Sequence, residues 1–317
     1  MVNVIIPHYN NCEGLRDLLT SLTLQSKKTF ATTIVDDCSD NIEEVKKIVN
    51  DFKGKIKLEL LQTSHNQGSG GARNVGLFGI DERFFDYVMF IDSDDFLLPR
   101  AIELLYKSAK QSNADIVSGP IIRETYLSSD KIPKENNTWC HNKLYKVSFL
   151  RTHNIYFPFI RANEDSSFNM MANELMEKRV YIDDELYLWR NNKKSITRKD
   201  NFYEKYAYLY IDAFVYAYIN VLGYKSLEKT ALSINVPNLY FYYQIAKEMD
   251  TTGKQAPYMD AMLAHFFQDY EIIPYIEEKI EEIAKNIQCN FIYNHQVYWF
   301  KENFADWLAR LGENNGI

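Results

Sequence analysis

Residues 2–10 read Val-Asn-Val-Ile-Ile-Pro-His-Tyr-Asn, and this stretch decides the fold. It begins as a short, mainly apolar run that stops at Pro7, which is typical of a strand buried on both faces of a parallel sheet. A helix is predicted next, because Asn11 can cap it and the leucines that follow fall on one helical face. These leucines are Leu15, Leu18, Leu19 and Leu22.

The same alternation of strands and helices continues to residue 119. Strands are predicted over residues 32–35, 57–62, 87–91 and 115–119, and helices over residues 43–52, 71–79 and 99–112. Alternating elements of this kind indicate an α/β fold, with a doubly wound, mainly parallel sheet and helices on both faces. Ligands of such sheets bind beyond the carboxyl ends of the strands. The residues just after each strand are therefore the candidates for a site.

The second part of the chain is less regular and ends in a helical region. Residues 128–138 are polar, include Pro133 and predict a loop, and irregular structure is expected from there to residue 199. From residue 200 to residue 317 the pattern is helical and rich in tyrosine and phenylalanine. An aromatic stripe, Tyr206, Tyr210, Phe214 and Tyr218, recurs at helical spacing. Such a stripe is most often helix-packing core, and the alternatives are a homo-oligomer interface or a glycan-binding face.

Composition and charge exclude several classes of protein. The chain has 317 residues, 46% of them apolar and 25% charged, which is ordinary for a globular protein and unlike a disordered or coiled-coil chain. The net charge of −7 gives no general attraction to nucleic acid, so only a local basic patch could bind it. The four cysteines are scattered without metal-ligand spacing, which fits a reducing compartment and a structural role.

The sequence shows no targeting signal. Met1 leads directly into a strand-like run, without a basic leader followed by an apolar region and a cleavage site. No uncharged apolar run is long enough to span a membrane. We therefore expect a cytoplasmic protein whose membrane contact, where it has any, is peripheral.

Asp92-Ser93-Asp94-Asp95, here called the acidic turn, follows a predicted strand and carries three carboxylates in four positions. Like charges this close raise one another's pKa, and a divalent cation removes that cost. Mg²⁺ or Mn²⁺ prefers oxygen ligands and typically combines one or two carboxylates with substrate phosphates. The acidic turn therefore predicts a metal and phosphate site. The alternative is a solvated turn that caps the next helix.

Two further polar segments lie at the ends of predicted elements. Residues 66–74, Asn-Gln-Gly-Ser-Gly-Gly-Ala-Arg-Asn, join a glycine-rich loop to a helix start, where backbone N–H groups and Arg73 can bind an anion. This glycine-rich segment lacks the P-loop lysine signature and the dinucleotide-binding pattern, and its alternative is a structural loop. Asp36-Asp37 follows the second strand, where Ser39 or Asp40 could cap the next helix.

Four motifs, taken in order, resemble those of family 2 glycosyltransferases of the GT-A fold. They are residues 4–10, residues 35–40, residues 66–76, and the acidic turn with Pro99. An ordered fourfold match is far more specific than any single motif. The likeness is strong over residues 1–120 and weaker to residue 200. It implies a GT-A catalytic domain over residues 1–199, with a nucleotide-sugar-binding half, 1–120, and an acceptor-side half, 121–199, followed by the helical region 200–317.

The resemblance implies a donor site for a nucleotide-sugar, most commonly a UDP-sugar. In the family, the tyrosine of the first motif packs on the base, the second aspartate of the Asp-Asp pair hydrogen-bonds the base, and the loop arginine contacts the nucleotide. The matching residues are Tyr9, Asp37 and Arg73. The DxD element matches Asp92, near the ribose, and Asp94, the metal ligand. The set implied for the nucleotide-sugar is Pro7, Tyr9, Asn10, Asp37, Gly71, Arg73, Asp92 and Ser93, with Asp94 and Asp92 holding Mn²⁺ or Mg²⁺.

Asn163-Glu164-Asp165-Ser166-Ser167-Phe168 resembles the Glu-Asp element of the same family, whose aspartate is the general base. An acceptor hydroxyl must lose its proton as it attacks the anomeric carbon, so a carboxylate within hydrogen-bond reach is needed. Asp165 is the candidate for this role. The alternative is a charge that stabilises the N-terminus of the following helix.

The acceptor side is matched less closely. Residues 139–145 resemble a tryptophan-to-lysine segment often found in bacterial relatives, although the spacing departs from the common form. The candidates for the acceptor side are Trp139, His141, Glu164 and Arg190. Core packing for Trp139 and a surface position for His141 are the alternatives. Arg190 and residues 195–198 resemble a late arginine and serine element of these enzymes.

The resemblance implies an inverting, metal-dependent transferase that moves a sugar to a hydroxyl of a glycan, a glycolipid or another acceptor. Three other functions compete with it. A sugar-phosphate nucleotidyltransferase would carry a glycine-rich signature after the first strand, and a non-catalytic binding module would not need Asp94 and Asp165. Glycosylation of hydroxymethylated bases in nucleic acid would use a basic cluster, Lys193, Lys194, Arg198 and Lys199.

Overall fold

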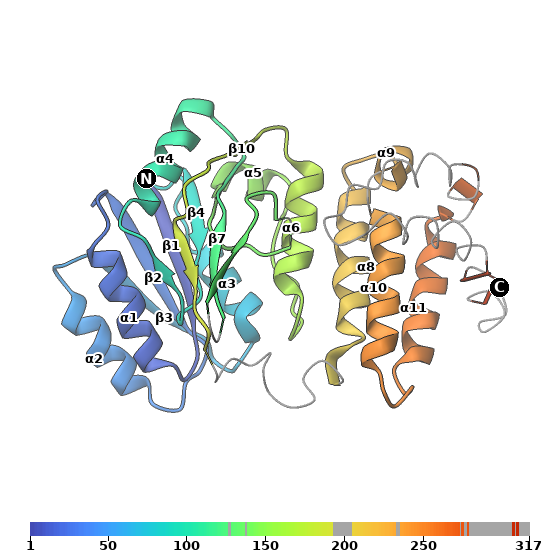
Figure 1. Cartoon of the computed structure of the whole chain (residues 1–317), viewed down its shortest axis with the longest axis horizontal. Coiled ribbons are helices and arrows are strands. Elements are labelled where there is room, and N and C mark those ends of the chain that lie inside the picture. Colours follow the sequence, from blue (N-terminus) through green and yellow to red (C-terminus); the bar gives the residue numbers. More distant parts are fainter. Residues whose placement is uncertain are drawn as a thin grey trace. The chain divides into compact units, whose positions relative to one another are not determined.

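The computed structural model describes residues 1–125, 128–136, 138–192, 205–232, 235–272, 274–275, 278, 306–307 and 309–310. The chain divides into two compact units, Met1–Lys193 and Lys194–Ile317, whose elements are drawn in Figure 1. The predicted boundary between residues 199 and 200 lies outside the described residues and stays a prediction.

A seven-stranded sheet forms the centre of the first unit. Its strands are β1 (Val2–His8), β2 (Phe30–Asp36), β3 (Lys57–Gln62), β4 (Tyr87–Phe90), β6 (Ile116–Ser118), β9 (Lys143–Lys146) and β10 (Arg179–Tyr181). They lie in the order β10-β6-β9-β4-β1-β2-β3, and each neighbouring pair is parallel except the two that include β9. The predicted α/β class with a mainly parallel sheet is confirmed.

Helices cover both faces of this sheet, as predicted. They are α1 (Cys12–Thr23), α2 (Ile42–Phe52), α3 (Gly68–Phe78), α4 (Ala101–Ser112), α5 (Val147–Thr152) and α6 (Glu164–Leu175). In Figure 1, α1 and α2 lie on one side of strands β1, β2 and β3, and α3 and α6 lie on the other.

The helix caps agree with the sequence at one position and differ at another. The Asn11 side chain caps α1 by accepting a hydrogen bond from the Gly14 N–H at 3.3 Å, as expected. The cap of α2 is Asn41, so the assignment of that cap to Ser39 or Asp40 is wrong. These two residues instead hydrogen-bond to Asn10, which follows β1, and the Ser39 hydroxyl also donates to Asp36 at the end of β2.

All seven residues of β1 are buried. Since neighbouring side chains of a strand point in opposite directions, both faces of β1 are covered. Val4 and Ile6 belong to the same buried apolar cluster as the α1 leucines Leu15, Leu18, Leu19 and Leu22. Ile5 points to the other face and packs against Gly76 of α3, where an added Cβ would lie 2.8 Å from Ile5 Cγ2. The helix therefore approaches the strand as closely as a glycine allows.

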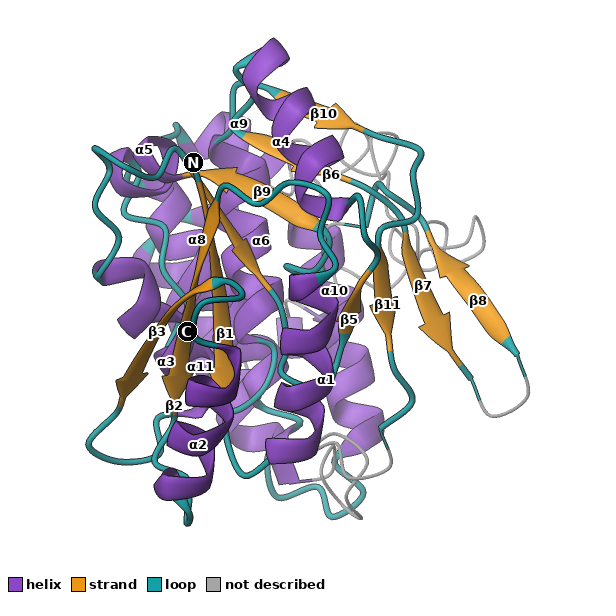
Figure 2. Ribbon diagram, turned by 90° about the vertical axis from the view of Figure 1, so that its left-hand side faces the viewer, coloured by secondary structure: helices purple, strands orange, loops and turns teal. Residues whose placement is uncertain are grey.

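A second sheet of four strands belongs to the first unit, and Figure 2 shows its strands side by side. The strands are β5 (Phe96–Leu97), β11 (Tyr187–Trp189), β7 (Ile121–Glu124) and β8 (Ser129–Ile132), in that order. The loop predicted over residues 128–138 is therefore wrong in part, because β8 pairs with β7. Three of the four β8 residues are exposed and polar, so the sequence shows no alternation of apolar and polar residues there. The segment is a strand because it pairs with β7.

The described helices of the second unit include α8 (Leu209–Leu222), α9 (Leu227–Leu232), α10 (Asn235–Met249) and α11 (Ala256–Asp269). Phe214 and Tyr218 of the aromatic stripe are buried. The ring centroid of Phe214 lies 5.4 Å from that of Tyr242, and the ring centroid of Tyr218 lies 5.3 Å from that of Phe266. This part of the stripe is therefore helix-packing core, and an oligomer interface stays a prediction. Among the helices that the structure describes, none has the length and apolar character needed to cross a membrane.

We expect Gly76→Ala to lower the free energy of unfolding by about 1–3 kcal/mol, because the new methyl group overpacks a core that is already full. Urea unfolding of the full chain measures the change. Gly79→Ala at the end of the same helix is the control, since its Cβ would meet the Gly76 carbonyl oxygen at an ordinary 3.6 Å. Equal losses at the two positions would contradict the argument.

Candidate active site

The parallel strands bring several polar segments to one edge of the large sheet, here called the carboxyl edge. In the pairing of β1 with β2, His8 lies opposite Asp36, and in the pairing of β1 with β4, Ile5 lies opposite Phe90. The residues that follow these strands, 9–10, 37–40 and 92–95, therefore meet at this edge. This is the arrangement that the strand order predicts.

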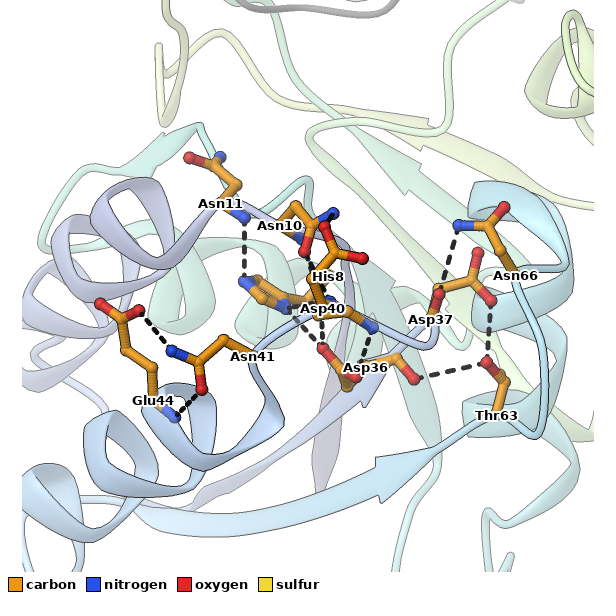
Figure 3. Close-up of polar contacts among 11 residues, drawn as sticks. His8, Asn10, Asn11, Asp36, Asp37, Asp40, Asn41, Glu44, Thr63 and Asn66 are labelled. Atoms are coloured by element: carbon orange, nitrogen blue, oxygen red, sulfur yellow. Dashed lines mark hydrogen bonds and ion pairs between the residues drawn. The ribbon is translucent and has the colours of Figure 1, made fainter.

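A buried pair, His8 and Asp36, supports the loops on the β1 and β2 side of the carboxyl edge (Figure 3). The His8 Nδ1 atom lies 2.9 Å from Asp36 Oδ1, and neither side chain is exposed. The Ser39 hydroxyl donates to the same Asp36 oxygen at 2.6 Å, and the Ser39 N–H donates to Asp36 Oδ2 at 3.0 Å. Asp36 therefore holds the two loops together from beneath.

Asn10 and Asp40 join the same two loops at the surface, and Figure 3 shows them facing each other. Asn10 Nδ2 donates to Asp40 Oδ2 and the Asp40 N–H donates to Asn10 Oδ1, both at 2.9 Å. Asn10 has a φ of 48°, in the left-handed region that asparagine tolerates better than most residues. Tyr9, between this pair and buried His8, is 49% exposed. Its ring is therefore carried on a fixed loop, which fits the predicted base platform.

Asp37 holds the glycine-rich segment. Its carboxylate accepts hydrogen bonds from the N–H of Gln67 at 2.8 Å and of Gly68 at 2.7 Å, and from the Thr63 hydroxyl at 3.0 Å. Gly68 has a φ of 82°, a conformation that favours glycine. Asp37 is 3% exposed, so its side chain acts first as an anchor for the start of α3. A hydrogen bond to the base stays a prediction.

Three other residues predicted to contact the nucleotide-sugar are also buried. Pro7 lies within β1, Gly71 lies in the first turn of α3, and Ser93 is 8% exposed. An added Cβ at Gly71 would lie 2.5 Å from the Cβ of Gln67, so the segment closes tightly on itself here. Contacts of these three residues with a nucleotide stay predictions.

Asp92 has one partner on each of its carboxylate oxygens. Arg73 Nη2 donates to Asp92 Oδ1 at 2.6 Å, and His141 Nε2 lies 3.1 Å from Asp92 Oδ2. Burial alone would raise the pKa of Asp92, but the charges of Arg73 and His141 outweigh it and hold the pKa well below its usual range. Likewise, burial opposes the protonated imidazole, yet Asp92 raises the pKa of His141. His141 is 8% exposed, so a surface position for this histidine is wrong.

Asp94 and Asp95 occupy different environments. Asp95 is 1% exposed and accepts hydrogen bonds from the Tyr187 hydroxyl and from the Arg190 N–H, the latter at 3.0 Å. Asp94 is half-buried and accepts a hydrogen bond from Asn192 Nδ2 at 2.7 Å. Burial raises the pKa of both carboxyl groups, and the charge of Asp92 adds to the rise. Asp95 supports the acidic turn, and Asp94 is the more accessible of the two.

The acidic turn contributes to a group of side chains that could hold a cation. One ligand atom each from Asp92, Asp95 and His141 lies within 4.8 Å of the other two. Carboxylate oxygens and imidazole nitrogens are ligands that Mn²⁺ accepts, so this donor set fits a divalent cation. Asp94 does not belong to the group, and its predicted role as a metal ligand stays a prediction.

Asp165 lies in the first turn of α6, and its side chain is half-buried. Burial raises its pKa to about 6, and the neighbouring charge of Glu164 adds to the rise. A carboxyl group with this pKa is ionised at neutral pH and is a stronger base than an ordinary aspartate. This environment fits a general base, and that role stays a prediction.

The acceptor-side candidates from later in the chain take part in packing and ion pairs. The Trp139 ring lies 5.0 Å from that of Trp189, and both pack against the large apolar cluster, as the core-packing alternative proposed. Arg190 Nη1 donates to Asp17 Oδ2 at 2.7 Å. The basic cluster at residues 193–199 and the motif at residues 195–198 lie outside the described residues.

Sequence reasoning did not find several residues that support the site. Tyr187 and Asn192 bind Asp95 and Asp94 across 92 and 98 residues of chain, and no local motif marks either of them. Lys143 belongs to the tryptophan-to-lysine segment, and its place in the sequence gives no sign of a structural role. Its ammonium group is buried, donates to the Trp139 carbonyl, and has a pKa lowered to about 7 by burial and by Arg179. Lys143 therefore fixes the turn that carries His141.

The sequence model of the family described as glycosyl transferase family 2 matches residues 3–172, which is more than half of the chain. The chain therefore belongs to glycosyltransferase family 2, as its motifs predicted. The match begins in β1 and ends within α6, so it includes the acidic turn and Asp165.

Curated relatives of the chain include two enzymes of Staphylococcus aureus. It is 27% identical to the poly(ribitol-phosphate) beta-N-acetylglucosaminyltransferase TarS over 209 residues, 61% of this chain and 36% of TarS. It is 35% identical to the corresponding enzyme TarP over 121 residues, 37% of this chain and 36% of TarP. Glycosyltransferase GlyA of Streptococcus pneumoniae is 28% identical over 241 residues, 67% of this chain and 33% of GlyA. The aligned part is about a third of the length of each relative.

Solved structures share the fold. The crystal structure of S. aureus TarS has a TM-score of 0.70 at 19% identity, covering 98% of this chain and 55% of that one. TarS 1-349 in complex with UDP-GlcNAc has a TM-score of 0.69 at 18% identity, with coverages of 96% and 91%. The mannosyltransferase PcManGT of Pyrobaculum calidifontis, in complex with GDP-Man and Mn²⁺, has a TM-score of 0.56 at 14% identity, with coverages of 92% and 88%. At these identities the likeness establishes the GT-A fold alone.

We expect Asp37→Asn to lower the free energy of unfolding by about 1–3 kcal/mol, because one acceptor oxygen becomes an amide group that faces a backbone N–H. Urea unfolding measures the loss. Asp40→Asn is the matched control, since this residue is exposed and its change should stay within about 0.5 kcal/mol. A similar loss at both positions would show that Asp37 does not anchor the segment.

Proposed function

We propose that this protein transfers a sugar from a UDP-sugar to an acceptor hydroxyl, with inversion at the anomeric carbon. The observation that carries the proposal is the half-buried Asp165, with its pKa raised to about 6, directly after Glu164. Arg73 joins Glu164 to Asp92 of the acidic turn. UDP is the proposed nucleotide because TarS has been solved with UDP-GlcNAc, and because TarS and TarP are named as N-acetylglucosaminyltransferases.

In the proposed reaction, Asp165 accepts the proton of the acceptor hydroxyl while that oxygen attacks the anomeric carbon. The nucleoside diphosphate leaves from the opposite face in one displacement, so no covalent sugar intermediate forms. Tyr9 carries the base, and Asp37 holds the glycine-rich segment around the nucleotide. A divalent cation, when bound at Asp92 and Asp94 or at the neighbouring Asp95 and His141, would supply positive charge for the departing diphosphate.

The proposed acceptor is a hydroxyl of a glycan or glycolipid. The names of TarS, TarP and a Bacillus spizizenii relative add poly(ribitol-phosphate) to the acceptors worth testing. The basic residues proposed for a nucleic acid acceptor lie outside the described part of the chain, so no observed contact favours that function. Intact carboxylates at Asp94 and Asp165 speak against a non-catalytic module.

Removal of the metal should abolish most of the activity. In a panel of UDP- and GDP-sugars, we expect turnover to need Mn²⁺ or Mg²⁺, and Asp94→Ala to lower kcat by about 10²–10³-fold, because charge stabilisation of the leaving group is lost. Initial rates with each cation and with a chelator measure both effects. Asp51→Ala, an exposed residue that pairs with Arg16, is the control. Turnover that is indifferent to chelation and to Asp94→Ala would overturn the metal-dependent mechanism.

The pH dependence should report Asp165. A general base must be ionised, so kcat/KM should fall as the pH is lowered through about 6, the raised pKa of Asp165. An aspartate with the ordinary pKa of 3.8 would lose its activity only at a lower pH. Asp165→Asn should abolish transfer while UDP still binds in calorimetry. Transfer that persists in this variant would remove Asp165 from the role of base.

A further inference from the structure

The guanidinium of Arg73 lies between carboxylates from distant parts of the first unit. Its Nη2 donates to Asp92 Oδ1 at 2.6 Å, and its Nη1 donates to Glu164 Oε1 at 2.9 Å. Only 3% of the Arg73 side chain and 10% of the Glu164 side chain are exposed. Asp92 follows β4, and Glu164 opens α6 directly before Asp165. The buried Arg73 guanidinium therefore links the acidic turn to the helix that carries the proposed base.

The next residue of α3, Asn74, uses its side chain to bind the backbone of Phe157. Asn74 Nδ2 donates to the Phe157 carbonyl at 2.8 Å, and the Phe157 N–H donates to Asn74 Oδ1 at 2.9 Å. The Phe157 ring lies 5.2 Å from Arg73 Cζ, and it stacks on Phe168 of α6 with centroids 4.1 Å apart. Arg73 therefore reaches α6 twice, through Glu164 and through the stacked rings.

Gly70 allows this close approach of α3 to the start of α6. An added Cβ at Gly70 would lie 2.9 Å from Glu164 Cγ and 3.1 Å from the Pro158 carbonyl oxygen. The neighbouring Ser69 hydroxyl also donates to Glu164 Oε1. A larger residue at position 70 would therefore push Glu164 away from Arg73 without removing either charge.

We propose that Arg73 is a positioning residue that clamps the start of α6 to the acidic turn and so sets the distance from Asp165 to the bound donor. This inference rests on the proposed function, because it assigns the clamp to that reaction. The clamp is a second role, separate from the nucleotide contact that the family resemblance implies for Arg73, because it uses the hydrogen bonds to Asp92 and Glu164. The guanidinium has further N–H groups that these two bonds leave over. The ion pair between Arg73 and Glu164 is costly to open because both side chains are buried, so the remaining partner keeps an uncompensated charge. Asp92, at the other end of the clamp, is 33% exposed. A displacement of about 1 Å in a reacting group can lower a rate about 10²-fold.

The test compares the wild type with Arg73→Lys, Gly70→Ala, Glu164→Gln and the Arg73→Lys, Glu164→Gln double variant. Lysine keeps the charge but has one ammonium group in place of a fork that reaches two carboxylates. Three measurements are made on each protein: the Kd of UDP by calorimetry, kcat and KM for sugar-nucleotide turnover, and deuterium exchange of peptides that cover α6. Arg16→Lys, in the exposed ion pair with Asp51, and Gly79→Ala are the matched controls.

The clamp predicts that Arg73→Lys and Gly70→Ala each lower kcat by about 10- to 100-fold. In Gly70→Ala, which leaves Arg73 in place, the Kd of UDP should change by less than about threefold. Exchange at the start of α6 should become at least about tenfold faster, because the helix end opens more often. The double variant should be no slower than the slower single variant, because both substitutions break one contact. The controls should match the wild type in all three measurements.

A loss of UDP affinity of about tenfold or more in Arg73→Lys, with α6 exchange unchanged there and with wild-type kcat in Gly70→Ala, would make Arg73 a nucleotide contact alone and overturn the clamp. Rate losses that multiply in the double variant would also overturn it. A wild type without turnover on any nucleotide-sugar would defeat the proposed function instead. The clamp would then be judged by deuterium exchange alone, and exchange equal to wild type in Arg73→Lys and Gly70→Ala would refute it.

Discussion

The parallel pairing of β1 with β2 on one side and with β4 on the other is the constraint on which the site depends. Because the three strands run in one direction, their following segments leave the sheet at the carboxyl edge. Strand β9 runs the opposite way beside β4, so the residues that precede it reach that same edge. The 3.1 Å contact between His141 and Asp92 is the direct result of this reversed strand. A fully parallel sheet would place the turn before β9 at the other end.

Several carboxylates at one edge would repel one another unless each had its own compensation. Asp92 is balanced by Arg73 and His141, whereas Asp95 is held by a tyrosine hydroxyl and a backbone N–H. Asp94 has an amide partner, and its pKa is raised by burial and by Asp92. The three residues of one short turn therefore differ in the direction of their pKa shifts and in accessibility, because their partners come from different elements.

The matches to family motifs do not by themselves reveal which side chains are free to bind a ligand. Asp37 matches a nucleotide-binding aspartate, yet its oxygens accept hydrogen bonds from the glycine-rich segment. Asp36, its neighbour, is buried with His8 beneath the loops. These anchors hold Tyr9 and the start of α3 in place, so the two aspartates shape the predicted donor side from within the protein.

The sequence by itself determined the order of strands and helices up to residue 119, apart from the short strand β5, together with the cap at Asn11 and the segments that meet at the carboxyl edge. It could do so because strands buried on both faces leave apolar runs, and amphipathic helices leave periodic ones. The partners of the site residues could not be predicted, since they join residues far apart, such as Arg73 and Glu164 across 91 positions. The polar strand β8, the burial of His141 and the direction of the Arg73 side chain were decided only by the tertiary structure. Each depends on a contact between elements that no local pattern encodes, and the free energy of that contact exists only once the sheet has assembled.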